Sequence, residues 1–121
     1  MTIIGYFEGT DPLLLTRALA AGAETLPLGN SVDGHGKYSG HLTPADGVSV
    51  IIGYLHKITP TTGIALTTGD ILMPAKVHNI PALILAPRDE HEYAKNILGG
   101  AADYVTLVDP ADAYEELRKY L

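Results

Sequence analysis

The most constraining feature of this sequence lies in residues 80–121, where the patterns of strand, helix, strand and helix follow one another almost without spacers. Residues 80–86 form a continuous apolar run, which is typical of a parallel strand covered on both faces by helices. Apolar residues at helical spacing follow over 88–98, and residues 103–108 predict the next strand. A final helix over 110–121 is predicted, with Asp109 at its N-cap. Strands alternating with helices therefore dominate this part of the chain.

The first two thirds of the chain continue this alternation. They predict three more strands, at residues 2–7, 23–28 and 48–55. A helix is predicted over 11–22, and residues 64–79 are helical in composition, although Gly69 and Pro74 favour a shorter helix that starts near Asp70. Five strands alternating with helices predict an α/β fold: a doubly wound parallel sheet of flavodoxin-like type, with strand order 2-1-3-4-5 in a three-layer sandwich.

Local signals fix finer details of these elements. Asp11 or Thr10 suits the N-cap of the first helix, because either side chain can accept a hydrogen bond from a free backbone N–H group, and Pro12 follows. Gly53 inside the third strand predicts a close approach of another group to the backbone. Asp89 is expected to cap the helix over 88–98.

The composition restricts the class of protein. A chain of 121 residues fits one domain, and 46% hydrophobic against 18% charged residues predicts a folded core. The net charge of −6 and the scattered basic residues argue against nucleic acid as a partner. Without cysteine, no disulfide, thiol nucleophile or cysteine-based zinc site can form. The short apolar N-terminal run lacks a basic region, so we expect a cytoplasmic protein with no membrane segment.

A doubly wound sheet predicts where a ligand would bind. Ligands of open α/β sheets lie outside the carboxyl ends of the strands, near the point where the strand order reverses. The loops expected at this edge are residues 8–11, 30–46, 56–63 and 86–91. The acidic residues Glu8 and Asp11 belong to the first of these loops.

Residues 59–63 contain Thr59, Thr61 and Thr62 and follow the third strand. If a helix starts there, their hydroxyl groups and its free N–H groups can hold a phosphate or a carboxylate. The alternative interpretation is an ordinary cap and turn, since clusters of Thr, Pro and Gly mainly punctuate secondary structure.

The long segment 29–47 carries five glycines and is expected to be a mobile loop. Its His35, Lys37 and His41 are candidate ligand contacts if the segment is a lid over the carboxyl edge. In the alternative, the segment is a solvated linker and these side chains point to solvent. The histidines are six residues apart, which is not the spacing of a zinc pair, so no metal site is predicted.

Further candidates follow the third and fourth strands. His56 can act as a general base or bind an anion, or it can simply pair with backbone at a strand end. Arg88 is a candidate anion ligand in the turn after the fourth strand. Tyr104, Tyr114 and Tyr120 cluster in the last strand and helix, where core packing explains most of them and an exposed remainder would suit a homodimer.

Four segments together resemble a response-regulator receiver domain. They are the acidic turn and Asp-Pro-Leu-Leu sequence at 8–14, the strand at 80–85, the Gly-Gly-Ala-Ala-Asp-Tyr-Val sequence at 99–105 and the last helix at 110–121. The resemblance implies a receiver-like fold. Receiver-like domains commonly associate through their last strand and helix, which favours a homodimer in this region.

The chemistry of a receiver is absent from the matching positions. A receiver has a phosphoacceptor aspartate at the end of its third strand, where this chain has Gly53, Tyr54 and Leu55. Ala86 stands in place of a hydroxyl residue, and Leu107 or Val108 in place of a lysine. The resemblance therefore implies a degenerate receiver that does not undergo phosphoryl transfer.

These observations favour a non-catalytic binding or signalling module that recognises a partner protein or a small anionic ligand. The alternative is a small enzyme, or a binder of a nucleotide or phosphate ligand, with its site between residues 29–47 and 59–63. No cofactor is identified from the sequence. A flavin is the least supported, because Tyr38 and Tyr54 are the only rings placed to sandwich it.

Overall fold

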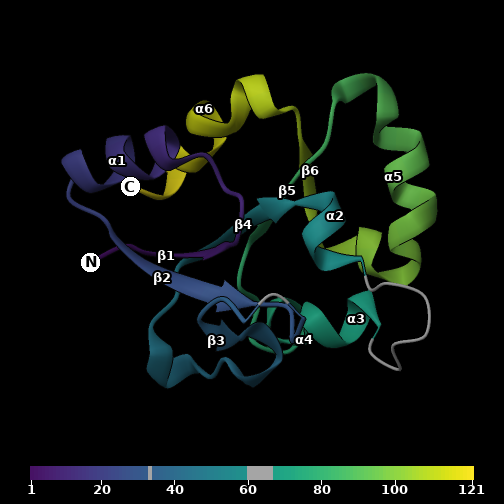
Figure 1. The fold of residues 1–121 in the computed structure, drawn as a ribbon, viewed down its shortest axis with the longest axis horizontal. Helices are drawn as coiled ribbons and strands as arrows, with labels where there is room; N and C mark the ends of the chain where they lie inside the picture. The colour runs from purple at the N-terminus through teal and green to yellow at the C-terminus, as the bar shows by residue number, and fades with distance from the viewer. Residues whose placement is uncertain (33, 60–66) are drawn as a thin grey trace.

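The computed structural model describes residues 1–32, 34–59 and 67–121, and it shows a parallel sheet with helices on both faces (Figure 1). Within these residues six strands run in the order β3-β2-β1-β4-β5-β6, each parallel to its neighbours. The strands are β1 (Ile3–Phe7), β2 (Glu24–Gly29), β3 (Lys37–Tyr38), β4 (Val50–Tyr54), β5 (Ala82–Leu85) and β6 (Thr106–Val108). β1 and β4 lie at the centre, and β3 and β6 form the edges.

Helical segments connect the strands in the described part of the chain. The α-helices are α1 (Pro12–Ala20), α2 (Leu55–Ile58), α3 (Thr68–Ile71), α4 (Met73–Val77), α5 (His91–Leu98) and α6 (Ala113–Leu117). The 3-10 turns are η1 (Ser39–His41), η2 (Pro44–Asp46), η3 (Arg88–Glu90), η4 (Gly99–Tyr104), η5 (Pro110–Asp112) and η6 (Arg118–Tyr120).

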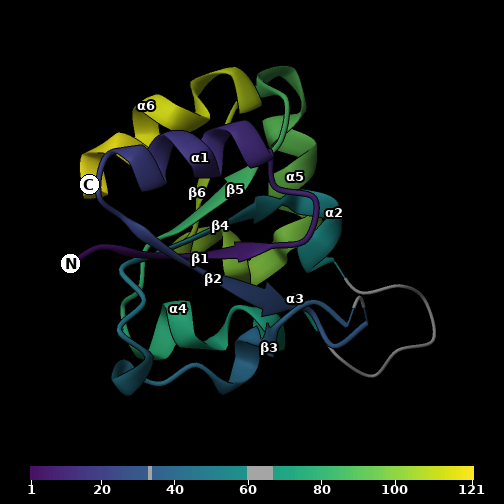
Figure 2. The same ribbon diagram turned by 60° about the vertical axis from the view of Figure 1, so that its left-hand side comes forward.

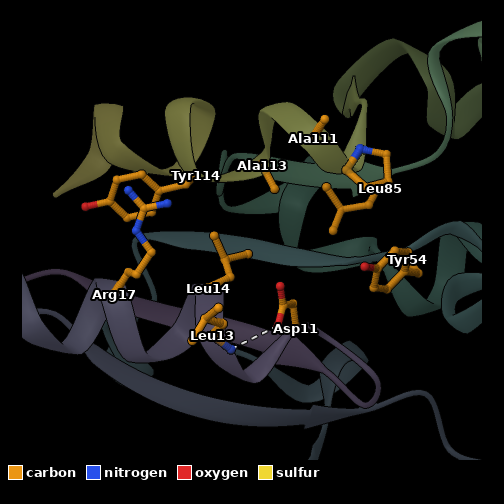
Figure 3. Close-up of a pocket in the computed structure, with 10 residues that line it drawn as sticks. Asp11, Leu13, Leu14, Arg17, Tyr54, Leu85, Ala111, Ala113 and Tyr114 are labelled. Carbon is orange, nitrogen blue, oxygen red and sulfur yellow. Dashed lines mark hydrogen bonds between the residues drawn. The ribbon is translucent and has the colours of Figure 1, made fainter.

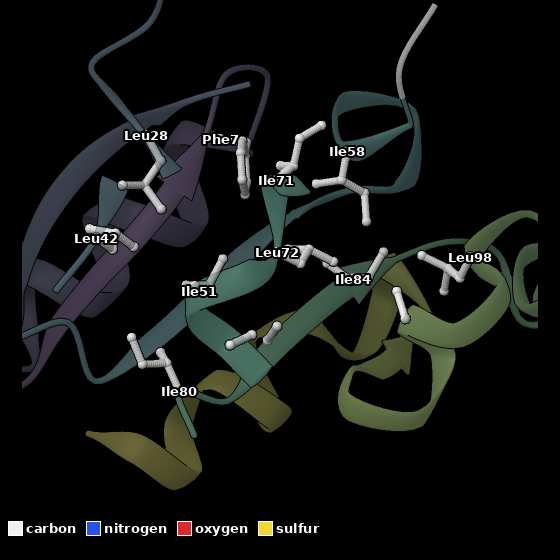
Figure 4. Packing of buried hydrophobic residues seen from close by; sticks show 13 residues of the cluster. Phe7, Leu28, Leu42, Ile51, Ile58, Ile71, Leu72, Ile80, Ile84 and Leu98 are labelled. Atoms are coloured by element: carbon white, nitrogen blue, oxygen red, sulfur yellow. The ribbon is translucent and has the colours of Figure 1, made fainter. Parts of the chain in front are cut away.

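Two hydrophobic clusters bind the helices to the two faces of the sheet. On one face α1 and α6 lie side by side (Figures 1 and 2). Leu14 and Leu117 pack with Ile52 beneath them. On the other face, beneath the remaining helices, Ile51 and Leu98 belong to the larger cluster (Figure 4). Ile51 and Ile52 are adjacent and both fully buried, because successive side chains of a strand point to opposite faces. This explains why the central strands read as continuous apolar runs.

The predicted α/β class and parallel sheet are confirmed, but the strand count and order differ from the prediction. Residues 37–38 form β3, an additional strand beside β2, so the sheet has six strands rather than the five of order 2-1-3-4-5. Only residues 30–36 join β2 to β3, whereas parallel strands usually need a crossover of a dozen residues or more. Gly36 permits this tight return, because its φ is +66° and a Cβ there would collide with the Pro27 carbonyl oxygen.

Several predicted helices and strands are shorter than expected. The described part of residues 64–79 contains two helices, α3 and α4, which meet at Leu72, because Pro74 can start a helix but not continue one. The strand predicted over residues 48–55 is β4, which ends at Tyr54, and residues 55–58 form α2. Of the strand predicted over residues 103–108, only β6 forms, because residues 99–104 belong to η4. Similarly, η3 precedes α5, and η5 and η6 flank α6.

The capping predictions have mixed outcomes. Asp11 caps α1 as predicted, since its Oδ1 accepts a hydrogen bond of 2.9 Å from the Leu13 N–H. Asp109 also caps as predicted, accepting a bond of 2.8 Å from the Ala111 N–H at the start of η5. The prediction for Asp89 is wrong. Glu90 is at the N-cap of α5 and makes no side-chain capping bond, because the chain enters this helix through η3.

The predicted close approach at Gly53 is confirmed. A Cβ at this position would lie 2.8 Å from Cδ2 of Phe7 and 3.1 Å from its Cβ. Phe7 is 1% exposed and belongs to the larger cluster, so its ring has little room to move. Glycine here allows the end of β1 to pack against β4.

Gly53→Ala should therefore destabilise the protein by about 1–3 kcal/mol, because the added methyl group overpacks the core against Phe7. The free energy of unfolding in urea measures this change. Gly100→Ala is the matched control, since a Cβ at Gly100 meets nothing within 4 Å, and its effect should stay within about 0.5 kcal/mol. Equal stability of the two variants would contradict the assigned contact.

Candidate functional site

The carboxyl ends of all six strands lie at one edge of the sheet because every pair of strands is parallel. The segments that leave this edge include residues 8–11 after β1, 55–59 after β4, 86–90 after β5 and 109–113 after β6. This is the place where open α/β sheets bind ligands. Two adjoining hollows lie over the ends of β4 and β5, and another, of about 120 Å³, lies at the end of β6 beside Arg88 and Asp109.

The first hollow, which we call the α1–α6 pocket, has a volume of about 150 Å³ and lies between α1 and α6 (Figure 3). It is lined by Asp11, Leu14 and Arg17 from the first helix, by Tyr54 and Leu85 at the strand ends, and by residues 110–111, 113 and 114. Leu14 and Leu85 give it an apolar floor, while charged groups stand around it.

Arg17 is the cation of this pocket. Its guanidinium carbon lies 3.6 Å from the centre of the Tyr114 ring, so the two side chains stack across the gap between the helices (Figure 3). Among the described residues, no carboxylate or carbonyl group accepts a hydrogen bond from this guanidinium. Stacking uses only one face of the plane, and its N–H groups stay available to a ligand.

Asp11 and Tyr54 provide the other polar groups. The capping bond to Leu13 occupies one carboxylate oxygen of Asp11 and keeps the side chain at the N-terminus of α1. Figure 3 shows Arg17 and Tyr114 at one end of the pocket and Tyr54 at the other, with Asp11 between them. The pocket thus carries both a positive and a negative side chain.

The second hollow, which we call the edge groove, has a volume of about 230 Å³ and a largely apolar lining. It is lined by Tyr54, His56, Leu85, Pro87, Glu90 and Tyr93, among others. Tyr54 and Leu85 line both hollows, so the two adjoin over the ends of β4 and β5. His56 belongs to this groove, exposed in α2, with its ring centre 6.0 Å from that of Tyr54.

Glu8 lies at this edge but is engaged by another residue. Its Oε2 accepts a hydrogen bond of 2.9 Å from Nζ of Lys57, which joins the loop after β1 to α2. The Lys57 carbonyl in turn accepts a bond of 2.7 Å from the Asn30 side chain at the end of β2. These contacts tie three carboxyl ends together, and the Glu8 carboxylate is stabilised by its lysine.

Arg88 lies away from the α1–α6 pocket and is also paired. Its guanidinium donates to the Asp112 carboxylate, and its backbone N–H donates to Oδ2 of Asp109 at 2.9 Å. His91 lies nearby with Nε2 2.8 Å from the Ala86 carbonyl oxygen. This network fastens the segment after β5 to the segment after β6.

The three candidates of segment 29–47 do not converge on the α1–α6 pocket. His35 Nδ1 lies 3.0 Å from the Leu28 carbonyl oxygen, at the end of β2. Lys37 forms an ion pair of 2.9 Å with Asp46 of the same segment. His41 is exposed and packs edge-on against Tyr38. The segment itself contains β3, η1 and η2 rather than an unbroken loop.

Of the three candidate threonines in residues 59–63, the structure describes only Thr59. The Thr59 hydroxyl lies 3.3 Å from the Leu55 carbonyl oxygen and 3.4 Å from that of His56, so it closes the end of α2. Thr61 and Thr62 lie outside the described residues. The described hydroxyl is therefore directed to its own helix.

The positions matching receiver chemistry lie at the carboxyl edge. Tyr54 stands at the end of β4 and contributes a phenol rather than a carboxylate to both hollows. Ala86 follows β5 and is buried, and Leu107 lies within β6. These side chains supply neither a phosphoacceptor carboxylate, nor a hydroxyl, nor an amine.

The aromatic cluster predicted near the C-terminus is divided between the two faces of the sheet. Tyr104 packs against the larger cluster, whereas Tyr114 and Tyr120 pack against the cluster under α1 and α6. The sequence indicated their packing role but not this division, because η4 and α6 lie on opposite sides of β6.

Arg17 and Tyr114 were missed as site residues by reasoning from the sequence. Leu14 and Arg17 are three residues apart and therefore neighbours on the surface of the predicted helix, which was an available signal. The contact of Arg17 with Tyr114 could not be predicted, because Tyr114 is almost 100 residues away in the chain. The two side chains meet only because α1 and α6 pack side by side on the sheet.

The described residues contain neither a metal-binding cluster nor a helix able to span a membrane. Across residues 1–32, 34–59 and 67–121, no three His, Asp or Glu side chains gather closely enough to hold a metal ion. No helix in these ranges has the length and apolar character to cross a membrane.

The fold and pocket together define an α/β protein with a polar hollow at the carboxyl edge. No family model, curated protein or solved structure matches the chain.

The network around Asp109 predicts a dependence of stability on pH. Hydrogen bonds from the Ala111 and Arg88 N–H groups hold the pKa of this carboxyl below its ordinary value of 3.8. Because the folded state lowers the pKa, the stabilisation is complete above the ordinary value and is lost as pH falls through the lowered one. Urea unfolding of wild type and Asp109→Asn should show a stability difference that shrinks from about pH 7 to about pH 2.5.

Asp103→Asn is the control for this titration, because Asp103 is exposed and its side chain accepts no hydrogen bond within the described part of the chain. Its stability should follow the wild type across the same pH range. A difference for Asp109→Asn that stays constant with pH would contradict the role assigned to the carboxylate.

Proposed function

We propose that this protein is a non-catalytic binding module that recognises a small anionic ligand in the α1–α6 pocket. The observation that carries the proposal is Arg17, which is stacked on Tyr114 and donates no hydrogen bond to any described residue. A guanidinium held in this way presents its N–H groups for two parallel bonds to a carboxylate or phosphate. The pocket that Arg17 lines also reaches the carboxyl ends of β4 and β5 through Tyr54 and Leu85, which supports the same conclusion.

The engagement of the other charged groups supports binding rather than catalysis. Asp11 and Asp109 accept capping hydrogen bonds, Glu8 pairs with Lys57, and His91 bonds a carbonyl group. General acid–base or nucleophilic chemistry needs a side chain whose partner activates it toward a substrate. Among the described residues of the two hollows, no nucleophile is hydrogen-bonded to a base.

Recognition of a partner protein is a second candidate, favoured by the edge groove. Its lining is mostly apolar, and Tyr93 and Ile97 of α5 are 66% and 39% exposed. Exposed aromatic and aliphatic groups of this kind are typical of protein contacts. The expected homodimer through the last strand and helix stays a prediction. β6 is an edge strand of the sheet, which would permit it.

The alternative of a small enzyme or nucleotide binder also stays a prediction. Its site would combine residues 29–47 with residues 59–63. The described cations of the first segment favour it less, because Lys37 is paired with Asp46 and His41 packs on Tyr38.

Carboxylate and phosphate ions should bind to the α1–α6 pocket with dissociation constants on the order of 1 mM, as expected for small ligands held mainly by one charged contact. Titration of ¹⁵N-labelled protein with acetate, valerate and methyl phosphate should shift the amide signals of residues 11–17 and 110–114. Arg17→Gln should remove these shifts.

Arg118→Gln is the matched control for the anion titration. It removes the same charge from η6, where Arg118 forms an exposed pair of 3.0 Å with Glu115 outside the pocket. Its shifts should equal those of the wild type. If no anion perturbs the pocket in the wild type, or if both variants lose binding equally, the proposed function is wrong.

We also propose that the chain is a degenerate receiver, and this makes a separate prediction. Incubation with acetyl phosphate and Mg²⁺ should leave its intact mass unchanged, because Tyr54 occupies the end of the strand where a receiver has its phosphoacceptor carboxylate. Mass spectrometry measures the result. A stable adduct with the mass of a phosphoryl group would contradict the assignment as a non-phosphorylated module.

A further inference from the structure

We infer that the edge groove is a binding site for a small organic cation with a quaternary ammonium group. This inference goes beyond the proposed function, because it concerns the second hollow and a ligand opposite in charge to the one proposed for the α1–α6 pocket. It follows from three aromatic rings, one carboxylate and a largely apolar lining, all of which belong to the same hollow.

The aromatic rings of the groove come from two neighbouring parts of the fold. Tyr54 ends β4 and His56 lies in α2, while Tyr93 belongs to α5, which lies beside α2 (Figures 1 and 2). The Tyr54 and His56 ring centres are 6.0 Å apart and their planes are inclined by 38°, so the two rings form an angled wall rather than a stack. Tyr93 is 66% exposed, which leaves its ring accessible to a ligand. The faces of tyrosine rings attract organic cations because their π electrons carry negative charge.

Glu90 supplies a negative charge that the groove does not neutralise. Its side chain is exposed, makes no capping bond to α5 and forms no ion pair with a described residue. The described lining of the groove contains neither lysine nor arginine, and the neighbouring Arg88 is paired with Asp112. A cation is therefore the electrostatic complement of this lining, and an anion would be repelled by it.

The shortage of hydrogen-bond acceptors favours a quaternary ammonium group over one that carries N–H groups. A primary ammonium group has three donors, and donors that lose water without gaining a partner cost free energy. Apart from Glu90 the lining is largely apolar, and the carbonyl oxygen of Ala86 already lies 2.8 Å from Nε2 of His91. A quaternary ammonium group has no N–H donor, and its methyl groups can contact the rings and the apolar surface directly.

The size of the groove limits the rest of the ligand. Its volume of about 230 Å³ lies below the roughly 300–1,000 Å³ of sites for drug-sized molecules. One trimethylammonium head group with a short tail is of suitable size. Choline has this chemistry and serves as the probe.

The test compares choline with dimethylbutanol, the neutral alcohol in which a carbon atom replaces the choline nitrogen, and with ethanolamine, which carries a primary ammonium group. Titrations followed by the amide signals of residues 55–56 and 86–93 should show choline binding roughly three- to fivefold more tightly than dimethylbutanol. Ethanolamine should bind most weakly, because it lacks the methyl groups and brings N–H donors to an apolar lining.

Tyr93→Leu isolates the contact with an aromatic ring. Leucine keeps an apolar side chain in α5, and because Tyr93 is exposed the fold should be retained, which circular dichroism checks. The variant should bind choline about threefold more weakly than the wild type does, whereas its affinity for dimethylbutanol should change by less than about twofold.

Glu90→Gln isolates the charge and should weaken choline binding by about two- to threefold. Glu92→Gln is the matched control, since it removes the same charge from the same helix. The Glu92 side chain is 91% exposed and pairs with Lys95 outside the groove. This variant should bind choline as tightly as the wild type does.

The outcomes are separate from those of the proposed function, because anion binding is read from residues 11–17 and 110–114. If dimethylbutanol binds as tightly as choline, the groove recognises apolar groups alone and the cation site is overturned. If Tyr93→Leu and Glu90→Gln both keep the full preference for choline, the assigned contacts are wrong. If no probe perturbs the groove, the inference fails and recognition of a partner protein is the better interpretation of this surface.

Discussion

The pairing of β1 with β4 is the constraint on which the rest of the structure depends. Ile4, Gly5 and Tyr6 pair with residues 50–52, and the chain builds the sheet outward from this pair in both directions. Right-handed crossovers place α1 on one face and the helices between β4 and β6 on the other. Only after β6 does the chain return to the face of α1. The stacking of Arg17 on Tyr114 is a consequence of that return.

Charge pairing explains why Arg17 stands out among the charged side chains near the carboxyl edge and the α1–α6 pocket. Most ionic groups here fasten one loop to another, as Lys57 does for Glu8 and Asp112 for Arg88. Exposed pairs of this kind contribute little stability individually, but they fix the positions of loops that have few buried side chains. Arg17 differs because its contact is a ring face, which restrains the guanidinium without occupying its hydrogen-bond donors.

The receiver resemblance stays a prediction, and the location of the candidate site follows from the parallel sheet itself. Acidic residues follow β1, and the loops at the carboxyl edge carry polar groups. In this protein Tyr54 divides that edge into the α1–α6 pocket and the edge groove, because its ring lines both. A phenol at this position separates two hollows, whereas a carboxylate would have offered a reactive group. The six-stranded sheet also carries β3, which the resemblance does not imply.

The sequence by itself determined the α/β class, the parallel strands, the cap at Asp11 and the close approach at Gly53. These features depend on local patterns: buried strands read as apolar runs, a carboxylate before Pro12 suits an N-cap, and glycine inside a strand admits a neighbour. The two-residue β3 and the division of the helices by short 3-10 turns are too brief to leave a periodic pattern. Only the tertiary structure decided the site, because Arg17 and Tyr114 are distant in the chain and meet solely where two helices pack on one face of the sheet.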